Sequence, residues 1–242
     1  MELIIVDNYR EMSERAAMLV VAEVEAKPSA VLGLATGSTP EGMYAELVKL
    51  NREDKVDFSR VTTFNLDEYA GLDPEHEQSY YHYMHYHLFN QIKIRPEQIN
   101  MPSCDLENVD QFCLEYDQRI AAAGGIDLQV LGIGGNGHIG FNEPGANLRV
   151  HTHLVDLTED TILANSRFFS SAEEVPKQAV TMGLGSIMLA GKIILLASGK
   201  AKAEAIARTV CGLINTAIPA SILQLHRDVT FIVDREAADL IT

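Results

Sequence analysis

Residues 126–145 read IDLQVLGIGGNGHIGFNEPG, and this segment gives the clearest indication of the architecture. Ile126–Ile133 is an apolar run with little polar alternation, which predicts a strand that is buried on both faces. Residues 132–145 contain six glycines, so the backbone after this strand is expected to bend tightly and to approach a ligand closely. A strand buried on both faces is typical of a parallel sheet.

Four further apolar runs have the same character, and helical patterns separate them. The runs are Ala30–Leu34, Val61–Leu66, Lys192–Ala197 and Val229–Val233. The helical patterns are Asn8–Glu25, Glu41–Leu50, Ser79–Ile92, Val109–Ala123 and Ala201–Gly212. This alternation predicts an α/β protein with a doubly wound, mostly parallel, Rossmann-like sheet and helices on both faces. We expect residues 1–242 to form a single domain, because no internal repeat or Pro/Gly/Ser-rich linker interrupts the pattern.

The amino-acid composition of the chain argues against two classes of binding partner. The chain has 242 residues, and its 19 basic and 34 acidic side chains give a formal charge of −15. Such acidity argues against binding to nucleic acid or to anionic membranes, since both require a basic surface. No apolar run reaches the roughly 18 residues of a membrane span, and the first residues lack the basic segment of a signal peptide. Neither nucleic acid nor an anionic membrane is therefore an expected partner.

The residue types that bind metals show no metal-site pattern. The cysteines are odd in number and match no zinc-binding spacing; they are Cys104, Cys113 and Cys211. The three histidines of Ser79–Phe89 do not all share one helical face, and no HExxH pattern accompanies them. A packed aromatic helix beside the site is therefore favoured over a metal centre. We expect reduced thiols and a cytoplasmic protein.

Polar residues follow several predicted strands, at the edge where doubly wound sheets bind ligands. The loop Thr36-Gly37-Ser38-Thr39 joins a strand to a helix, where free N–H groups and the positive end of the helix favour a phosphate monoester. It matches neither the Gly-x-x-x-x-Gly-Lys-Ser/Thr motif nor the Gly-x-Gly-x-x-Gly motif. The alternative is a plain strand–turn–helix connection in which Ser or Thr caps the helix.

Two other strand ends carry groups suited to acid–base chemistry. Asp67 and Glu68 follow the second run, and in a partly closed cleft their repulsion would raise the pKa of one, which could then act as a base. A solvated turn is the alternative for this pair. His138 belongs to the residue type that titrates near neutral pH, and Glu143 is close enough in sequence to orient its imidazole.

Two cations are candidates for the phosphate itself. Arg167 offers a planar fork of donors that suits phosphate oxygens. Lys202 begins a predicted helix, where the dipole disfavours a cation, and this suggests a functional reason for its presence. An ordinary surface charge is the alternative for either residue.

Four of these segments together resemble the glucosamine-6-phosphate deaminase family. They are residues 34–40 (LATGSTP), 65–69 (NLDEY), 137–144 (GHIGFNEP) and 164–169 (ANSRFF), in this order along nearly the whole chain. The resemblance implies conversion of the phosphosugar D-glucosamine 6-phosphate and water to D-fructose 6-phosphate and ammonia. It also implies that this reaction uses no metal and no organic cofactor.

By the same resemblance, Asp67 is the base that moves a proton from C2 to C1, and His138 opens the pyranose ring with Glu143 as its charged partner. Asn136 joins this catalytic group, although many family members have Asp there, so the relay lacks a third carboxylate in this sequence. The residues that resemble the family's phosphate site are Thr36, Gly37, Ser38, Thr39, Arg167 and Lys202.

In length the chain resembles the short bacterial members of the family. This resemblance implies that N-acetylglucosamine 6-phosphate does not activate the protein. We expect a monomer or a small homo-oligomer. One alternative is a 6-phosphogluconolactonase, but there the residues after the histidine read toward SLFPG rather than residues 141–145, FNEPG. The other is a sugar-phosphate sensor without catalysis. Retention of Asp67, His138 and Glu143, and the lack of an N-terminal helix-turn-helix, argue against the sensor.

Overall fold

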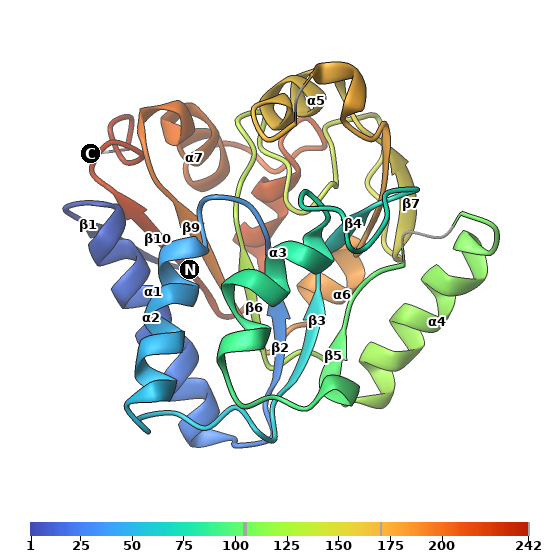
Figure 1. Ribbon diagram of the computed structural model, residues 1–242. Coiled ribbons are helices and arrows are strands. Elements are labelled where there is room, and N and C mark those ends of the chain that lie inside the picture. Colours follow the sequence, from blue (N-terminus) through green and yellow to red (C-terminus); the bar gives the residue numbers. More distant parts are fainter. Residues whose placement is uncertain (104–105, 170, 242) are drawn as a thin grey trace.

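The computed structural model describes residues 1–103, 106–169 and 171–241, and a seven-stranded parallel sheet forms its centre (Figure 1). The strands are, in sheet order, β1 (Glu2–Val6), β10 (Val229–Asp234), β9 (Lys192–Ala197), β6 (Leu128–Leu131), β2 (Val31–Leu34), β3 (Thr62–Asn65) and β5 (Ile99–Asn100). Neighbouring strands pair in parallel throughout this sheet. The doubly wound α/β class is confirmed.

Each of the five predicted apolar runs coincides with one of the five inner strands, and the run Val229–Val233 ends one residue before β10 does. The residues of β2, β6 and β10 are all buried, which explains why these runs lack polar alternation. The sequence analysis missed the two edge strands. β1 exposes Leu3 and Ile5, and β5 has two residues, so neither gives the continuous apolar signal of a central strand.

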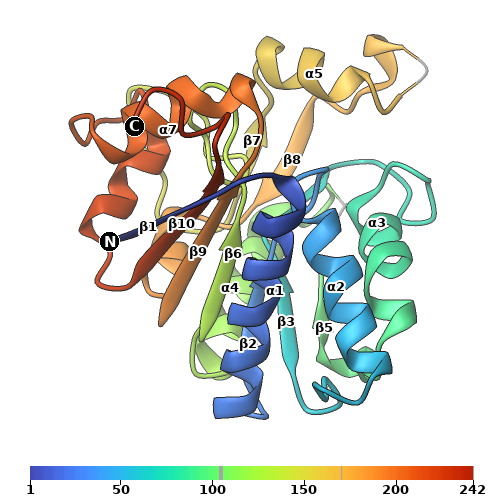
Figure 2. The same cartoon turned by 90° about the vertical axis from the view of Figure 1, so that its left-hand side faces the viewer.

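A second sheet has three short antiparallel strands, and the sequence analysis did not predict it. Its order is β4 (Asp67–Tyr69), β8 (Gln178–Thr181) and β7 (His153–Asp156). In the views of Figures 1 and 2, this sheet and helix α5 (Glu159–Ser166) lie beyond one end of the large sheet. Strand β4 begins two residues after β3 ends, so the chain passes from one sheet to the other at Leu66.

Helices cover both faces of the large sheet (Figure 2). Buried side chains of α1 (Tyr9–Ala26), α2 (Glu41–Arg52) and α3 (Tyr80–His87) pack on one face. Those of α4 (Val109–Ala122), α6 (Leu184–Met188) and α7 (Ala203–Val210) pack on the other. No helix among the described residues is long and apolar enough to cross a membrane.

The helix boundaries follow local signals with two corrections. Asn8 caps α1 by accepting a hydrogen bond from the Glu11 N–H at 3.0 Å. The predicted helix Ser79–Ile92 ends at His87, and a 3-10 turn, Phe89–Gln91, follows it. The predicted helix from Ala201 begins instead with the 3-10 turn Lys200–Lys202. Of the cysteines, Cys113 is buried and Cys211 exposed, while Cys104 lies outside the described residues.

Candidate active site

The large sheet reverses its winding direction between β2 and β6. From β2 the chain proceeds to β3 and β5 on one side, and from β6 to β9 and β10 on the other. Doubly wound sheets bind ligands at this point, because the two flanking loops diverge there. A cavity of about 1260 Å³ lies here, and the loops after both strands line it. Every site residue predicted from the sequence lines this cavity except Glu143, which contacts His138.

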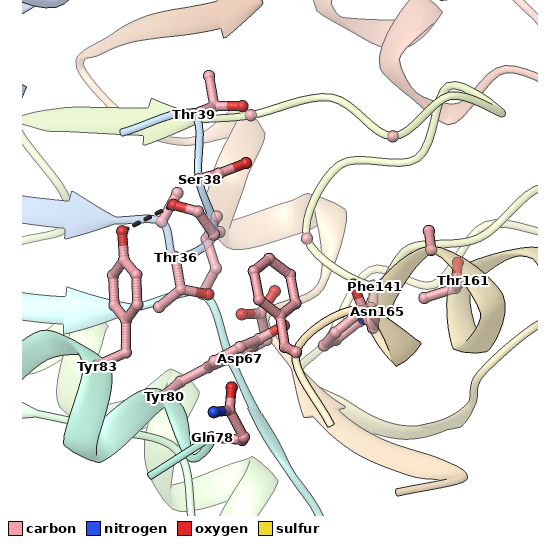
Figure 3. Close-up of a pocket in the computed structure, with 18 of the residues that line it drawn as sticks. Thr36, Ser38, Thr39, Asp67, Gln78, Tyr80, Tyr83, Phe141, Thr161 and Asn165 are labelled. Atoms are coloured by element: carbon pink, nitrogen blue, oxygen red, sulfur yellow. Dashed lines mark hydrogen bonds between the residues drawn. The ribbon is translucent and has the colours of Figure 1, made fainter. Parts of the chain in front are cut away.

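The loop Thr36–Thr39 is held in place through its carbonyl groups. Tyr83 donates to the Gly37 carbonyl (2.7 Å) and Tyr9 to that of Ser38 (3.0 Å), while Tyr44 donates to the carbonyl of Ala35 (2.5 Å), the residue just before the loop. Figure 3 shows the bond from Tyr83. Gly37 has φ +92°, a conformation that strains any other side chain. The tyrosines come from three different helices, so no local sequence pattern indicates these contacts.

The two predicted cations lie beside this loop. Arg167 Nη2 is 3.3 Å from Ser38 Oγ, and its guanidinium stacks 4.6 Å from the centre of the Phe168 ring. Lys202 Nζ donates to the Ile133 carbonyl at 2.7 Å. Burial and the nearby charge of Arg167 lower the pKa of Lys202. Two neighbouring cations beside a hydroxyl-rich loop can bind a phosphate dianion, which relieves their mutual repulsion.

Asp67 opens strand β4 and is 6% exposed. Burial raises its pKa to about 8; the adjacent Glu68 also raises it, and a hydrogen bond with the Thr36 side chain opposes the rise. Burial, rather than the repulsion between the two acids that the sequence led us to expect, is the larger cause of this shift. Figure 3 shows Thr36 on one side of Asp67 and Thr161 on the other. A carboxylate in this environment can abstract a proton near neutral pH.

Glu68 is buried and serves as a cap for helix α3. It accepts hydrogen bonds from the backbone N–H groups of Tyr69 (2.9 Å), Tyr80 (2.9 Å) and Tyr81 (2.8 Å). Burial raises the pKa of Glu68, and these hydrogen bonds oppose the rise. The solvated turn that was the alternative for the pair is therefore excluded. Asp67 lines the cavity. Glu68, on the same strand, links this strand to the N-terminal end of helix α3 through these hydrogen bonds.

His138 and Glu143 form a hydrogen-bonded pair. His138 Nδ1 lies 3.2 Å from Glu143 Oε2, and Asn136 Nδ2 donates to the same oxygen at 2.8 Å. Burial raises the pKa of Glu143, but the hydrogen bond and the charge of His138, together with hydrogen bonds from Thr161 and Asn136, outweigh burial and lower this pKa. Gly134 is required for this arrangement, because a Cβ there would lie 2.4 Å from the His138 ring. An imidazole held by a carboxylate can transfer protons at a sugar oxygen.

The structure also brings in a residue that the sequence analysis missed. Thr161, on helix α5, donates a hydrogen bond to Glu143 Oε1 at 2.5 Å and lines the cavity. Its position depends on how α5 packs, which no local pattern encodes. Among the described residues, no group of three His, Cys, Asp or Glu side chains could hold a metal ion.

A family model for glucosamine-6-phosphate isomerases/6-phosphogluconolactonase matches residues 7–232. The chain belongs to this family. The resemblance seen in the four sequence segments is confirmed by this match together with full-length relatives that are named glucosamine-6-phosphate deaminase. A curated relative from Thermoanaerobacter sp. (strain X514), named glucosamine-6-phosphate deaminase, is 56% identical over 241 residues, which are 100% of this chain and 95% of the relative.

Solved structures of the family share the fold. That of a monomeric glucosamine-6-phosphate deaminase is 45% identical, with 99% of this chain and 100% of that chain covered and a TM-score of 0.97. A 6-phosphogluconolactonase from Trypanosoma brucei is 20% identical, with 100% and 98% covered and a TM-score of 0.79. At this low identity, the second likeness concerns the fold alone.

Proposed function

We propose that the protein converts D-glucosamine 6-phosphate and water to D-fructose 6-phosphate and ammonia. The observation that carries the proposal is the buried carboxylate of Asp67, which shares one cavity with the Thr36–Thr39 loop and with His138. Isomerisation of a sugar needs a base at a carbon-bound proton, in addition to groups that open the ring. The 56% identity to a named deaminase supports this reading over other reactions of the family.

The phosphate group fixes the substrate in the cavity. The Thr36–Thr39 loop offers N–H and hydroxyl donors, and Arg167 and Lys202 offer two positive charges. A chain of net charge −15 otherwise repels a phosphate dianion, so this local positive site provides the attraction. Binding energy at the phosphate then orients the carbons that react.

His138 acts first. It transfers a proton to the ring oxygen O5 while O1 loses its proton, which breaks the C1–O5 bond and leaves an open-chain aldehyde. Glu143 stabilises the imidazole in the required orientation and in its charged form. Asn136 fixes the Glu143 carboxylate by a neutral hydrogen bond.

The ammonium group of the bound substrate loses a proton, Asp67 removes the proton from C2, and O1 gains one, which gives an enolamine. Return of the proton from Asp67 to C1 produces a C2 iminium ion. Water adds to C2, the C2–N bond breaks to release ammonia, and loss of a proton from the added oxygen leaves the ketone. The amino group of the substrate is cationic at neutral pH, so its arrival beside Asp67 favours the ionised carboxylate. Burial thus keeps the base neutral in the empty site and ready to ionise when substrate binds.

The site residues named here all belong to one chain, so the proposal is compatible with a monomer. A cytoplasmic location is part of the proposal as well; Cys113 and Cys211 are free thiols, in keeping with a reducing compartment.

The test compares three substrates with the purified protein. We expect ammonia and fructose 6-phosphate in equal amounts from glucosamine 6-phosphate, and far slower turnover of unphosphorylated glucosamine. Hydrolysis of 6-phosphogluconolactone without ammonia release would assign the lactonase reaction instead. Binding of glucosamine 6-phosphate without turnover would indicate a sensor.

A further inference from the structure

Helix α5 has one buried residue, and that residue is polar. Of its eight residues, all of which the structure describes, Thr161 is buried, at 4% exposure. Leu163, on the same helix, is 70% exposed. The half-buried Ile162 supplies the apolar contact of the helix by packing against the cluster that contains Tyr69 and Phe141, so the burial of the Thr161 hydroxyl needs another explanation.

The hydroxyl of Thr161 is part of a chain of hydrogen bonds that ends at the imidazole. Thr158, the N-cap of α5, donates from Oγ1 to Thr161 Oγ1 at 3.1 Å, and Thr161 in turn donates to Glu143 Oε1. The other oxygen, Glu143 Oε2, contacts Asn136 and His138. The carboxylate therefore bridges helix α5 on one side and the glycine-rich loop on the other.

The opposite end of α5 reaches the phosphate loop. Arg167 is the C-cap of this helix, and its guanidinium contacts Ser38 Oγ. The helix thus contacts the two halves of the site, through Thr161 near its beginning and Arg167 at its end. A helix of two turns is a rigid connection between these contacts.

We propose that Thr161 is a positioning residue, whose hydroxyl holds Glu143 against His138 and couples phosphate binding by Arg167 to ring opening. This inference rests on the proposed function and deepens it. When the phosphate draws Arg167 inward, α5 is fixed, and Thr161 then fixes the Glu143 carboxylate. Ring opening becomes efficient only when a phosphorylated substrate is in place.

The test uses Thr161→Val, which keeps the shape and branching of threonine but lacks the hydroxyl, and Thr161→Ser, which keeps the hydroxyl. We expect Val to lower kcat about tenfold with KM changed less than about twofold, and Ser to stay within about twofold of the unmodified protein. Leu163→Ala, on the exposed face of α5, is the matched control and should leave kcat unchanged.

Two double variants test the route of the effect. Because Thr161 acts through Glu143, Thr161→Val should change kcat little further in a Glu143→Gln background. Because Arg167 fixes the helix, the effect of Thr161→Val should also shrink in an Arg167→Ala background. Equal loss of kcat in the Val and Ser variants, or a full tenfold loss in both backgrounds, would overturn the inference.

The unmodified protein is measured in parallel, which separates this inference from the proposed function. No ammonia release by the unmodified protein would refute the function itself. Normal release by both the unmodified protein and Thr161→Val would leave the function standing and would refute the positioning role.

Discussion

Replacement of Asp67 by Asn should slow catalysis strongly and stabilise the fold, with a stabilisation that grows with pH. Asn keeps the size of the side chain and its ability to bond with Thr36, but it cannot ionise. The buried carboxylate has a pKa raised from 3.8 to about 8. Because the folded-state pKa is raised, protonated Asp67 favours the folded state below about pH 4, and this contribution is lost as the pH rises toward 8. The Asn variant has no such loss at position 67.

The size of the effect follows from the same values. A rise from 3.8 to about 8 corresponds to at most about 6 kcal/mol above pH 8, at about 1.36 kcal/mol per pH unit. Relaxation and water penetration reduce such penalties in real proteins. We therefore expect Asp67→Asn to gain about 1–4 kcal/mol more stability at pH 8 than at pH 5, while kcat falls by about 10²–10⁴.

Urea unfolding at pH 5 and pH 8 measures this difference, since effects of the substitution that do not depend on pH cancel, and the bond to Thr36, which favours the ionised carboxylate, is already included in the raised pKa. Asp57→Asn is the matched control. Hydrogen bonds from Ser59 lower the pKa of the exposed Asp57, so its contribution is lost only as the pH falls below about 4, outside the tested range. A stabilisation of Asp67→Asn that is the same at both pH values would refute the burial argument.

Three further predictions concern the rest of the site. Lys202→Ala and Arg167→Ala should each raise KM more than they lower kcat, with a loss in kcat/KM of roughly 1.5–3 kcal/mol; a larger effect on kcat than on KM would contradict the phosphate role. Asn136→Asp adds a negative charge that favours the imidazolium of His138, so one limb of the pH profile of kcat/KM should move up by about one pH unit. Identical profiles of the variant and the unmodified protein would show that residue 136 does not affect the imidazole. Glu68→Gln removes a charge that raises the pKa of Asp67, so the acidic limb of the pH profile of kcat/KM should move to lower pH. If this limb does not move, Glu68 only caps helix α3.

The inner strands could be predicted because burial on both faces leaves a continuous apolar run, as in Lys192–Ala197. The small sheet could not. Its strands have three or four residues, and β7 has no buried residue, so neither apolar runs nor alternation mark it. Helix α3 was predicted too long, because the aromatic pattern continues into the 3-10 turn Phe89–Gln91 while the backbone at Leu88 leaves the helical region.

The candidate site could be assembled from the sequence because parallel strands end at one edge, which brings the loops after β2 and β6 together. The supporting contacts could not be anticipated. Thr161 reaches Glu143 across 18 positions, and Tyr83 reaches Gly37 across 46, so both depend on the packing of helices rather than on any local motif. Candidate catalytic and binding side chains at strand ends can thus be predicted from the sequence. The side chains that orient them cannot, because their contacts depend on the tertiary structure.

The most direct test of the account follows the proton that Asp67 is proposed to move. Glucosamine 6-phosphate labelled with deuterium at C2 is incubated with the unmodified protein and with Asp67→Asn, and the loss of the label from C2 is measured by NMR. We predict that the label leaves C2 at the rate of ammonia release in the unmodified protein, and at least about 100-fold more slowly in Asp67→Asn, with substrate affinity largely retained. Loss of the label at the same rate from both proteins would contradict the assignment of Asp67 as the base.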